Sequence, residues 1–174
     1  MDLKALVCLG AGMLIGANLG MIIAALFRAN DEPTESPVIR VKLDKGAFLP
    51  VRAHESDAGL DLMSPVRVVL RPKTREKINT GVHVEIPTGY VGMLKSKSGL
   101  MTWNGLTSEG TIDAGYTGEI GVVLFNHSDE MMIIERGHKI SQLVVLPIIT
   151  PKVVPVDEIE GGERGSDGFG STGR

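Results

Sequence analysis

From residue 38 onward the sequence consists of short apolar or alternating runs, each closed by turn-forming residues. The runs cover residues 38–43, 66–70, 81–86, 90–94, 120–125, 131–134, 139–146 and 152–156. Runs this short and rich in β-branched residues are typical of strands, and we find no useful window with the 3.6-residue apolar period of a helix. Turn signals at intervals of about 8–12 residues favour a sandwich, jelly roll or barrel. The pattern therefore predicts a mainly β domain.

Composition limits what this domain can contain. The 174 residues suffice for one domain with appendages. Hydrophobic residues make up 43% of the chain but aromatic residues only 4%, so the core must be built from Val, Ile, Leu and Met. The net charge of −3 gives no sign of a nucleic-acid-binding surface. One cysteine and four scattered histidines argue against a disulfide framework and a Cys/His metal site.

The amino-terminal segment has a different character. Residues 5–27 are apolar apart from Asn18, and about 20 apolar residues suffice to cross a bilayer. A cleaved signal peptide is the alternative, but the run lacks the small-x-small ending of its cleavage site. We expect residues 1–28 to form an uncleaved transmembrane anchor, followed by a polar, proline-containing linker at residues 29–37. Basic residues after the run favour a membrane-anchored protein whose catalytic domain is cytoplasmic.

Residues 110–119 (GTIDAGYTGE) combine three glycines with one carboxylate and one aromatic ring. Glycines at this density indicate a tight bend or a close approach of the backbone to another group. The apolar, β-branched residues 120–125 follow directly. We therefore predict a β-hairpin that presents Asp113 and Tyr116 at its tip. The alternative is an ordinary glycine-rich hairpin with a solvated aspartate.

Polar clusters interrupt the apolar pattern at four other places: residues 58–62 (AGLDL), 95–100 (KSKSGL), 136–143 (RGHKISQL) and 164–173 (RGSDGFGSTG). The lysines and hydroxyls of the second cluster could bind anionic oxygens, and Gln142 inside an apolar strand needs partners. The last cluster lies in residues 157–174, which we expect to be a flexible glycine-rich tail. Each cluster alone is also explained by a turn, a solvated loop, a sheet cross-link or a free tail.

Taken together and in this order, the segments AGLDL, KSKSGL, EGTIDAGYTGEI, RGHKISQLV and ERGSDGFGSTG resemble the five motifs of the trimeric dUTPase family, the dUTP diphosphatases. The resemblance covers residues 38–174. Two positions depart from it. Ser96 and Lys97 stand where the commoner pattern has Pro-Arg, and Thr107 stands where many members carry an asparagine that reads uracil.

The resemblance implies a fold, a reaction and an assembly. Residues 38–156 would form the jelly-roll-like, distorted β-barrel of the dUTPase fold, and residues 157–174 would form a flexible lid. The protein would be a homotrimer with active sites at subunit interfaces. It would hydrolyse dUTP to dUMP and pyrophosphate by attack of water at the α-phosphorus, limiting dUTP and supplying dUMP. Mg²⁺ would be bound to the triphosphate.

The resemblance also implies residue roles. Asp113 would orient and deprotonate the attacking water, and Tyr116 would lie against the deoxyribose and leave no room for a 2′-hydroxyl. Asp61 would act on the metal indirectly, through water, and Phe169 would stack on uracil. The substrate-binding residues implied are Lys97, Ser98, Gly99, Thr107, Thr111, Ile112, Tyr116, Gln142, Arg164, Phe169, Gly170, Ser171 and Thr172.

Two other functions stay open at this point. One is a nucleotide enzyme similar to dCTP deaminase, whose fold is related; the pair of Asp113 and Tyr116 argues for phosphorus chemistry instead. The other is a membrane-tethered regulatory protein that binds nucleotide on the same scaffold.

Overall fold

The computed structural model describes residues 37–162 and 165–166. The described part contains ten strands and one helix: β1 (Arg40–Leu43), β2 (Gly59–Met63), β3 (Val68–Leu70), β4 (Arg75–Glu85), β5 (Tyr90–Lys95), α2 (Ser98–Asn104), β6 (Leu106–Ser108), β7 (Gly110–Asp113), β8 (Glu119–Asn126), β9 (Met132–Ile134) and β10 (Lys139–Pro147). The predicted mainly β architecture is confirmed.

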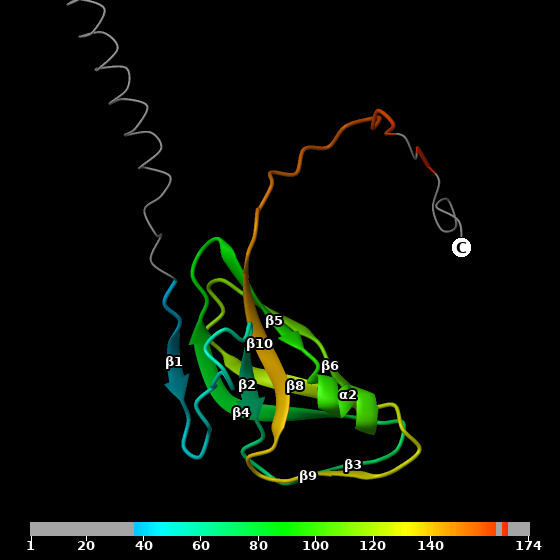
Figure 1. Cartoon of the computed structure of the whole chain (residues 1–174). Coiled ribbons are helices and arrows are strands. Elements are labelled where there is room, and N and C mark those ends of the chain that lie inside the picture. Colours follow the sequence, from blue (N-terminus) through cyan, green and yellow to red (C-terminus); the bar gives the residue numbers. More distant parts are fainter. Residues whose placement is uncertain (1–36, 163–164, 167–174) are drawn as a thin grey trace, which may run out of the picture. The chain divides into compact units, whose positions relative to one another are not determined.

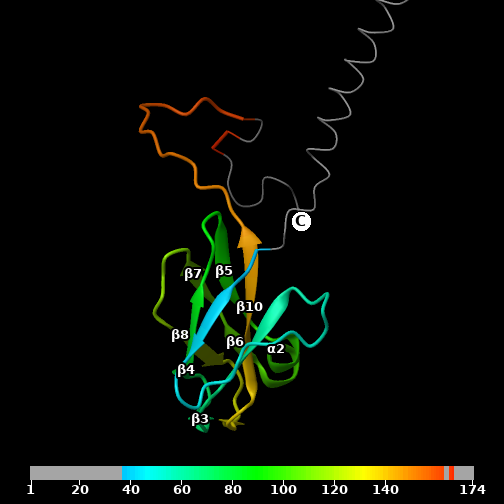
Figure 2. The same ribbon diagram turned by 90° about the vertical axis from the view of Figure 1, so that its left-hand side faces the viewer.

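The strands form three antiparallel sheets. Their orders are β1-β4-β8-β6, β2-β10-β5-β7 and β3-β9. β10 runs between β2 and β5 in the second sheet, while the long β4 and β8 lie side by side in the first (Figures 1 and 2). Helix α2 lies next to β6, the strand that follows it (Figure 1).

The buried core of the described residues consists of leucine, isoleucine and valine, as the low aromatic content predicts, whereas the expected methionine appears only at its edge, as the half-buried Met132. β8 shows how the sequence builds it, because its side chains alternate strictly between buried and half-buried positions. Ile120, Val122 and Leu124 point inward and are at most 1% exposed. Burial of each such side chain contributes about 1.5–3 kcal/mol.

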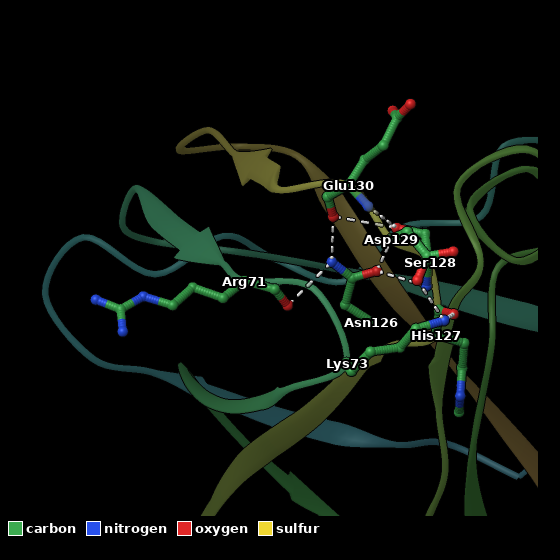
Figure 3. Close-up of polar contacts among 7 residues, drawn as sticks. All are labelled: Arg71, Lys73, Asn126, His127, Ser128, Asp129 and Glu130. Carbon is green, nitrogen blue, oxygen red and sulfur yellow. Dashed lines mark hydrogen bonds and ion pairs between the residues drawn. The ribbon is translucent and has the colours of Figure 1, made fainter.

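The next inward position of β8 is polar and ties down the following loop. The Nδ2 group of Asn126 donates to the carbonyl oxygens of Leu70, Arg71 and Glu130 at 3.3, 3.1 and 2.8 Å. Its Oδ1 accepts from the Ser128 amide and hydroxyl at 3.0 and 2.7 Å (Figure 3). Asn126 thus replaces a core contact with a satisfied hydrogen-bond network that joins the β8–β9 loop to the end of β3.

The predicted strand at residues 152–156 is wrong. Residues 148–162 contain no strand or helix, and Val153 and Val156 are 88% and 64% exposed. The run has the β-branched composition of a strand, but within the described chain no sheet edge pairs with it. Composition alone does not make a strand, because strand stability comes from pairing and packing against neighbours.

The predicted β-hairpin around Asp113 is also wrong. β7 pairs with β5, whereas β8 pairs with β4 and β6, so the two strands belong to different sheets. Residues 114–118 carry the chain from one sheet to the other, and Gly115 adopts the left-handed φ of 91° that this turn requires.

Three elements were not predicted. β2 lies in the polar cluster at residues 58–62, and β6 has only three residues, so in both the apolar alternation is too short to recognise. Helix α2 has only two turns and no buried residue, so it has no apolar period. It ends at Gly105, whose φ of 63° lets its N–H reach the carbonyls of Leu100 and Met101.

No helix among the described residues is long and apolar enough to cross a membrane. The predicted anchor at residues 1–28 lies outside the described residues, as do residues 29–36 of the predicted linker. The same holds for the tail residues implied in substrate binding, which are Arg164, Phe169, Gly170, Ser171 and Thr172.

Candidate active site

Asp113 and Tyr116 line one pocket at the crossing between the sheets. Its volume is about 240 Å³, and its walls are Lys77, Thr111, Ile112, Asp113, Tyr116, Glu119 and Gly121. Asp113 ends β7 with its side chain exposed. The structure therefore brings together the predicted acid and ring, with Thr111 and Ile112 beside them.

The ring of Tyr116 is held in a fixed place. Its hydroxyl donates to the carbonyl oxygen of Glu119 at 2.9 Å, and its backbone N–H donates to the carbonyl of Asp113 at 3.1 Å. A Cβ atom at Gly118 would overlap the Tyr116 hydroxyl, so only glycine leaves room for the ring. Gly118 is thus needed for close packing, whereas the left-handed backbone of the turn lies at Gly115.

Lys77 is a residue of this pocket that sequence analysis missed. Its side chain crosses over Gly121, where a Cβ atom would overlap the lysine Cε. Lys77 pairs with Val123 in the β4–β8 ladder, but residues 75–79 were not predicted to be a strand. Because the sequence does not predict a strand at residues 75–79, no sequence signal places the Lys77 ammonium group near Asp113.

A second pocket joins three of the polar clusters. Its volume is about 270 Å³, and its walls are Ala53, Asp57, Ala58, Gly59, Asp61, Lys97 and Gln142. The register of β10 explains the grouping, because Gln142 lies opposite Asp61 of β2 and Lys95 of β5. A Cβ at Gly59 would come within 2.6 Å of the Gln142 Oε1, so this glycine makes room for the amide.

Asp61 is a buried carboxylate shared by two lysines. Its side chain is 5% exposed, and its Oδ1 and Oδ2 lie 2.5 Å from the Lys97 Nζ and 2.7 Å from the Lys139 Nζ. Burial alone would raise the pKa of Asp61, but hydrogen bonds from Lys139 and Lys97 outweigh it and hold that pKa below its usual value. Two ammonium groups around one carboxylate leave positive charge beside the pocket, which suits an anionic ligand.

Ser96 has a structural explanation. Its hydroxyl accepts from the Ser108 N–H at 2.9 Å and donates to the Ser108 carbonyl at 3.1 Å. The Ser108 hydroxyl donates in turn to Ser141, whose hydroxyl reaches the Lys95 carbonyl. Where the commoner motif has proline, this chain therefore uses a serine to join the segment before Lys97 to β6 and β10.

Thr107 lies in a third pocket, of about 340 Å³, lined by Ser96, Met101, Thr107, Glu109, Phe125 and His127. Its Oγ1 is 2.8 Å from the Nε2 of His127. Ser98 and Gly99 begin α2 directly after Lys97 and line neither of the first two pockets. The structure thus does not group Thr107, Ser98 and Gly99 with Asp113.

The comparisons with known proteins agree with one another. A family model described as dUTPase matches residues 46–173. The chain belongs to the dUTPase family. It is 42% identical to the deoxyuridine 5′-triphosphate nucleotidohydrolase of Clostridium novyi (strain NT), over 76% of this chain and 95% of that protein. It is 43% identical to that of Tropheryma whipplei (strain Twist), over 76% and 93%. Family membership confirms the predicted dUTP diphosphatase and its reaction, the hydrolysis of dUTP.

Solved dUTPase structures are similar as well. The Staphylococcus bacteriophage 80alpha dUTPase with dUPNHPP has 38% sequence identity and a TM-score of 0.74, over 80% of this chain and all of that one. A mutant dUTPase from phage phi11 of S. aureus, described with a structural Mg(II) ion, has 34% identity and a TM-score of 0.67, over 72% and 100%. These similarities confirm the dUTPase fold.

Mg²⁺ that arrives with the substrate is compatible with the described residues of this dUTPase. They contain no group of three or more His, Cys, Asp or Glu side chains that could hold a metal ion. Both oxygens of Asp61 already accept from lysines. Mg²⁺ commonly keeps several waters and is bound through one or two carboxylates and the phosphates of a nucleotide. Mg²⁺ carried by dUTP would therefore fit these residues.

The Asp61 cluster makes dUTPase stability depend on pH. Because its pKa is lowered on folding, Asp61 stabilises the fold above the ordinary carboxyl pKa of about 3.9, and this contribution is lost as pH falls through the lowered value. We expect Asp61→Asn to cost about 1–3 kcal/mol at pH 7 and to weaken the acid sensitivity. Denaturant unfolding between pH 7 and pH 2 measures both.

Asp129→Asn is the matched control. Asp129 also pairs with a lysine, Lys73 at 3.0 Å, but its side chain is 90% exposed. An exposed pair of this kind contributes at most about 1 kcal/mol. Equal losses in the two variants, or unchanged acid sensitivity in Asp61→Asn, would contradict the role given to the buried carboxylate.

Proposed function

We propose that Asp113 is the general base of dUTP hydrolysis. It orients and deprotonates a water that attacks the α-phosphorus, which yields dUMP and pyrophosphate. The observation that carries this proposal is the exposed Asp113 carboxylate at the end of β7, in one pocket with the fixed ring of Tyr116. Since a carboxylate is a weak base, positioning and charge stabilisation must supply much of the rate. The reaction would limit dUTP and supply dUMP.

The second pocket would hold the triphosphate. Lys97 supplies a positive charge, Gln142 an amide N–H and Ser98 a hydroxyl from the adjacent helix. Mg²⁺ bound to the triphosphate would neutralise part of its charge, with Asp61 acting through water. From the family resemblance, Arg164, Ser171 and Thr172 would add phosphate contacts, Phe169 and Gly170 would cover the uracil, and residues 157–174 would close as a lid.

Tyr116 would exclude ribonucleotides by shape. Its ring lies against Gly118 and is fixed by the bond to Glu119, so it forms a wall that cannot readily retreat. Such a wall matters because an apolar pocket by itself discriminates against an added hydroxyl by only about 10². The backbone of β7 near Thr111 and Ile112 would read the uracil edges. Thr107 precedes β7 in the chain, and its hydroxyl lies 2.8 Å from the Nε2 of His127.

The family resemblance implies a homotrimer, and two features of the chain support the association of copies. The pocket of Asp113 and the pocket of Lys97 share no residue, so one chain offers the base and the phosphate ligands in separate places. The residues beyond β10 expose large apolar side chains, with Ile149 at 91% and Val153 at 88%. A second copy that covers these side chains and adds its own Asp113 pocket would complete a site.

Asp113→Asn tests the role of the base. We expect kcat for dUTP to fall by at least about 10²-fold, because loss of a general base costs about 10²–10⁴ in rate, while binding of dUPNHPP persists. Pyrophosphate release and calorimetric titration measure the two effects, and Asp129→Asn serves as the exposed control. Near-normal turnover in Asp113→Asn would contradict the proposal. Ammonia release from dCTP by the unaltered enzyme would contradict it as well.

We also propose that residues 5–27 anchor the enzyme in a membrane with its catalytic domain in the cytoplasm. The length and apolarity of this run support the proposal. We expect the full chain to sediment with membranes and to stay there in carbonate washes, whereas a chain lacking residues 1–28 becomes soluble. Recovery of the full chain in the soluble fraction would refute the anchor.

A further inference from the structure

His83 of β4 reaches the loop that carries Tyr116. Its Nδ1 is 2.9 Å from the carbonyl oxygen of Thr117, and its Nε2 is 3.0 Å from the Oδ2 of Asp44. The His83 side chain is only 18% exposed. The imidazole thus lies between the β1–β2 connection and residues 114–118, which lead from Asp113 into β8.

Both partners of the ring only accept hydrogen bonds. A neutral imidazole has one N–H, whereas an imidazolium has two, so both bonds form together only when His83 is protonated. The hydrogen bond to Asp44, followed by the bond to the Thr117 carbonyl, raises the pKa of His83 above its usual value. The hydrogen bond from His83 correspondingly lowers the pKa of Asp44.

The other charged groups near the His83 ring are of both signs. On β1, Lys42 lies opposite His83 and 3.5 Å from the Asp44 carboxylate, and it disfavours the imidazolium. On β8, Glu119 lies opposite His83, and its carboxylate accepts from a backbone N–H of β4 at 2.7 Å. Arg40 and Glu85 pair with each other at 3.1 Å.

The bond from His83 differs from the other bonds of the loop. The Tyr116 N–H and hydroxyl bond to Asp113 and Glu119, within the same stretch of chain. The His83 bond instead joins Thr117 to β4, the strand that also pairs with β8 at Glu119. It therefore holds the loop itself, at a residue that precedes the β4–β8 ladder.

We propose that His83 is a positioning residue for dUTP hydrolysis, whose imidazolium ties Thr117 to β4 and so places Asp113 and Tyr116. The proposal rests on the roles given above to Asp113 and Tyr116. The tie is complete below the ordinary histidine pKa of about 6.5 and is lost as pH rises through the raised pKa of His83. Above that pH a neutral ring can donate to only one of its two acceptors.

The test follows two groups by NMR in the full chain, with ¹³C on the histidine and tyrosine rings, between about pH 5.5 and 9.5. We expect the chemical shifts of the Tyr116 ring to change with pH at the same midpoint as those of His83, at a pH above about 6.5. Tyr90 of β5 is the internal reference and should not follow that midpoint. In Asp44→Asn, which removes the charged partner, both midpoints should move to lower pH.

His83→Gln supplies the functional arm. The glutamine side chain has one amide nitrogen, so it cannot replace the two ring nitrogens that contact Thr117 and Asp44. The pH response of the Tyr116 signals should therefore vanish. We also expect kcat for dUTP to fall about tenfold, because Asp113 would be misplaced. Asp129→Asn is the control, because the exposed Asp129 carboxylate also takes part in a polar pair, with Lys73 at 3.0 Å, and lines neither the Asp113 pocket nor the Lys97 pocket. It should leave kcat and the Tyr116 midpoint unchanged.

Two results would overturn the role of His83. One is a His83 midpoint at or below about 6.5, and the other is a Tyr116 response that persists in His83→Gln. The NMR coupling does not require turnover, so it is separable from the proposed catalysis. An active Asp113→Asn variant would refute the role of Asp113 as general base. The coupling of Tyr116 to His83 would still be measured directly by NMR.

Discussion

The pairing of β10 with β2 on one side and β5 on the other determines where the residues proposed to bind phosphate lie. This register sets Gln142 opposite Asp61 and Lys95, residues that are far apart in the sequence. A bulge between Lys139 and Ser141 shifts the register at the start of β10, and the Lys139 ammonium reaches the Asp61 carboxylate that also holds Lys97. A buried carboxylate left without these lysines would be costly, so the cluster stabilises the sheet and at the same time gathers positive charge.

The same sheet ends in β7, and there the chain leaves it. Because β7 pairs with β5 while β8 pairs with β4 and β6, residues 114–118 must cross between two sheets. The crossing exposes Asp113 and Tyr116 at the surface, where a substrate can reach them. It also leaves them dependent on local ties, which are the bond from Tyr116 to Glu119 and the bond from His83 to Thr117.

The sequence predicted those parts of the fold that depend on local pattern. Strands such as β5, β8 and β10 have continuous or alternating apolar residues, and these were recognised. The crossing at residues 114–118 was mistaken for a hairpin, because local sequence does not specify which strands β7 and β8 pair with. The run at residues 152–156 was mistaken for a strand for the converse reason: its composition is right but the described chain offers it no partner. In the candidate site, the motifs single out Asp113, Tyr116, Lys97 and Gln142. Lys77 joins them only through the β4–β8 pairing. Lys139 lies within the RGHKISQL cluster, but its contact with Asp61 follows a bulge that the motif does not specify.

The central claim is that each active site combines the Asp113 pocket of one chain with the Lys97–Gln142 pocket of another. Coexpression of Asp113→Asn with Gln142→Ala, each expected to lower the turnover of a site that contains it, tests the claim directly through the dUTP turnover of the purified mixed assemblies. If the pockets come from different chains and the variants assort randomly, about a quarter of the sites combine two unaltered pockets, and about that share of activity returns. Assemblies shown to contain both chains that remain as inactive as either variant alone would contradict the claim.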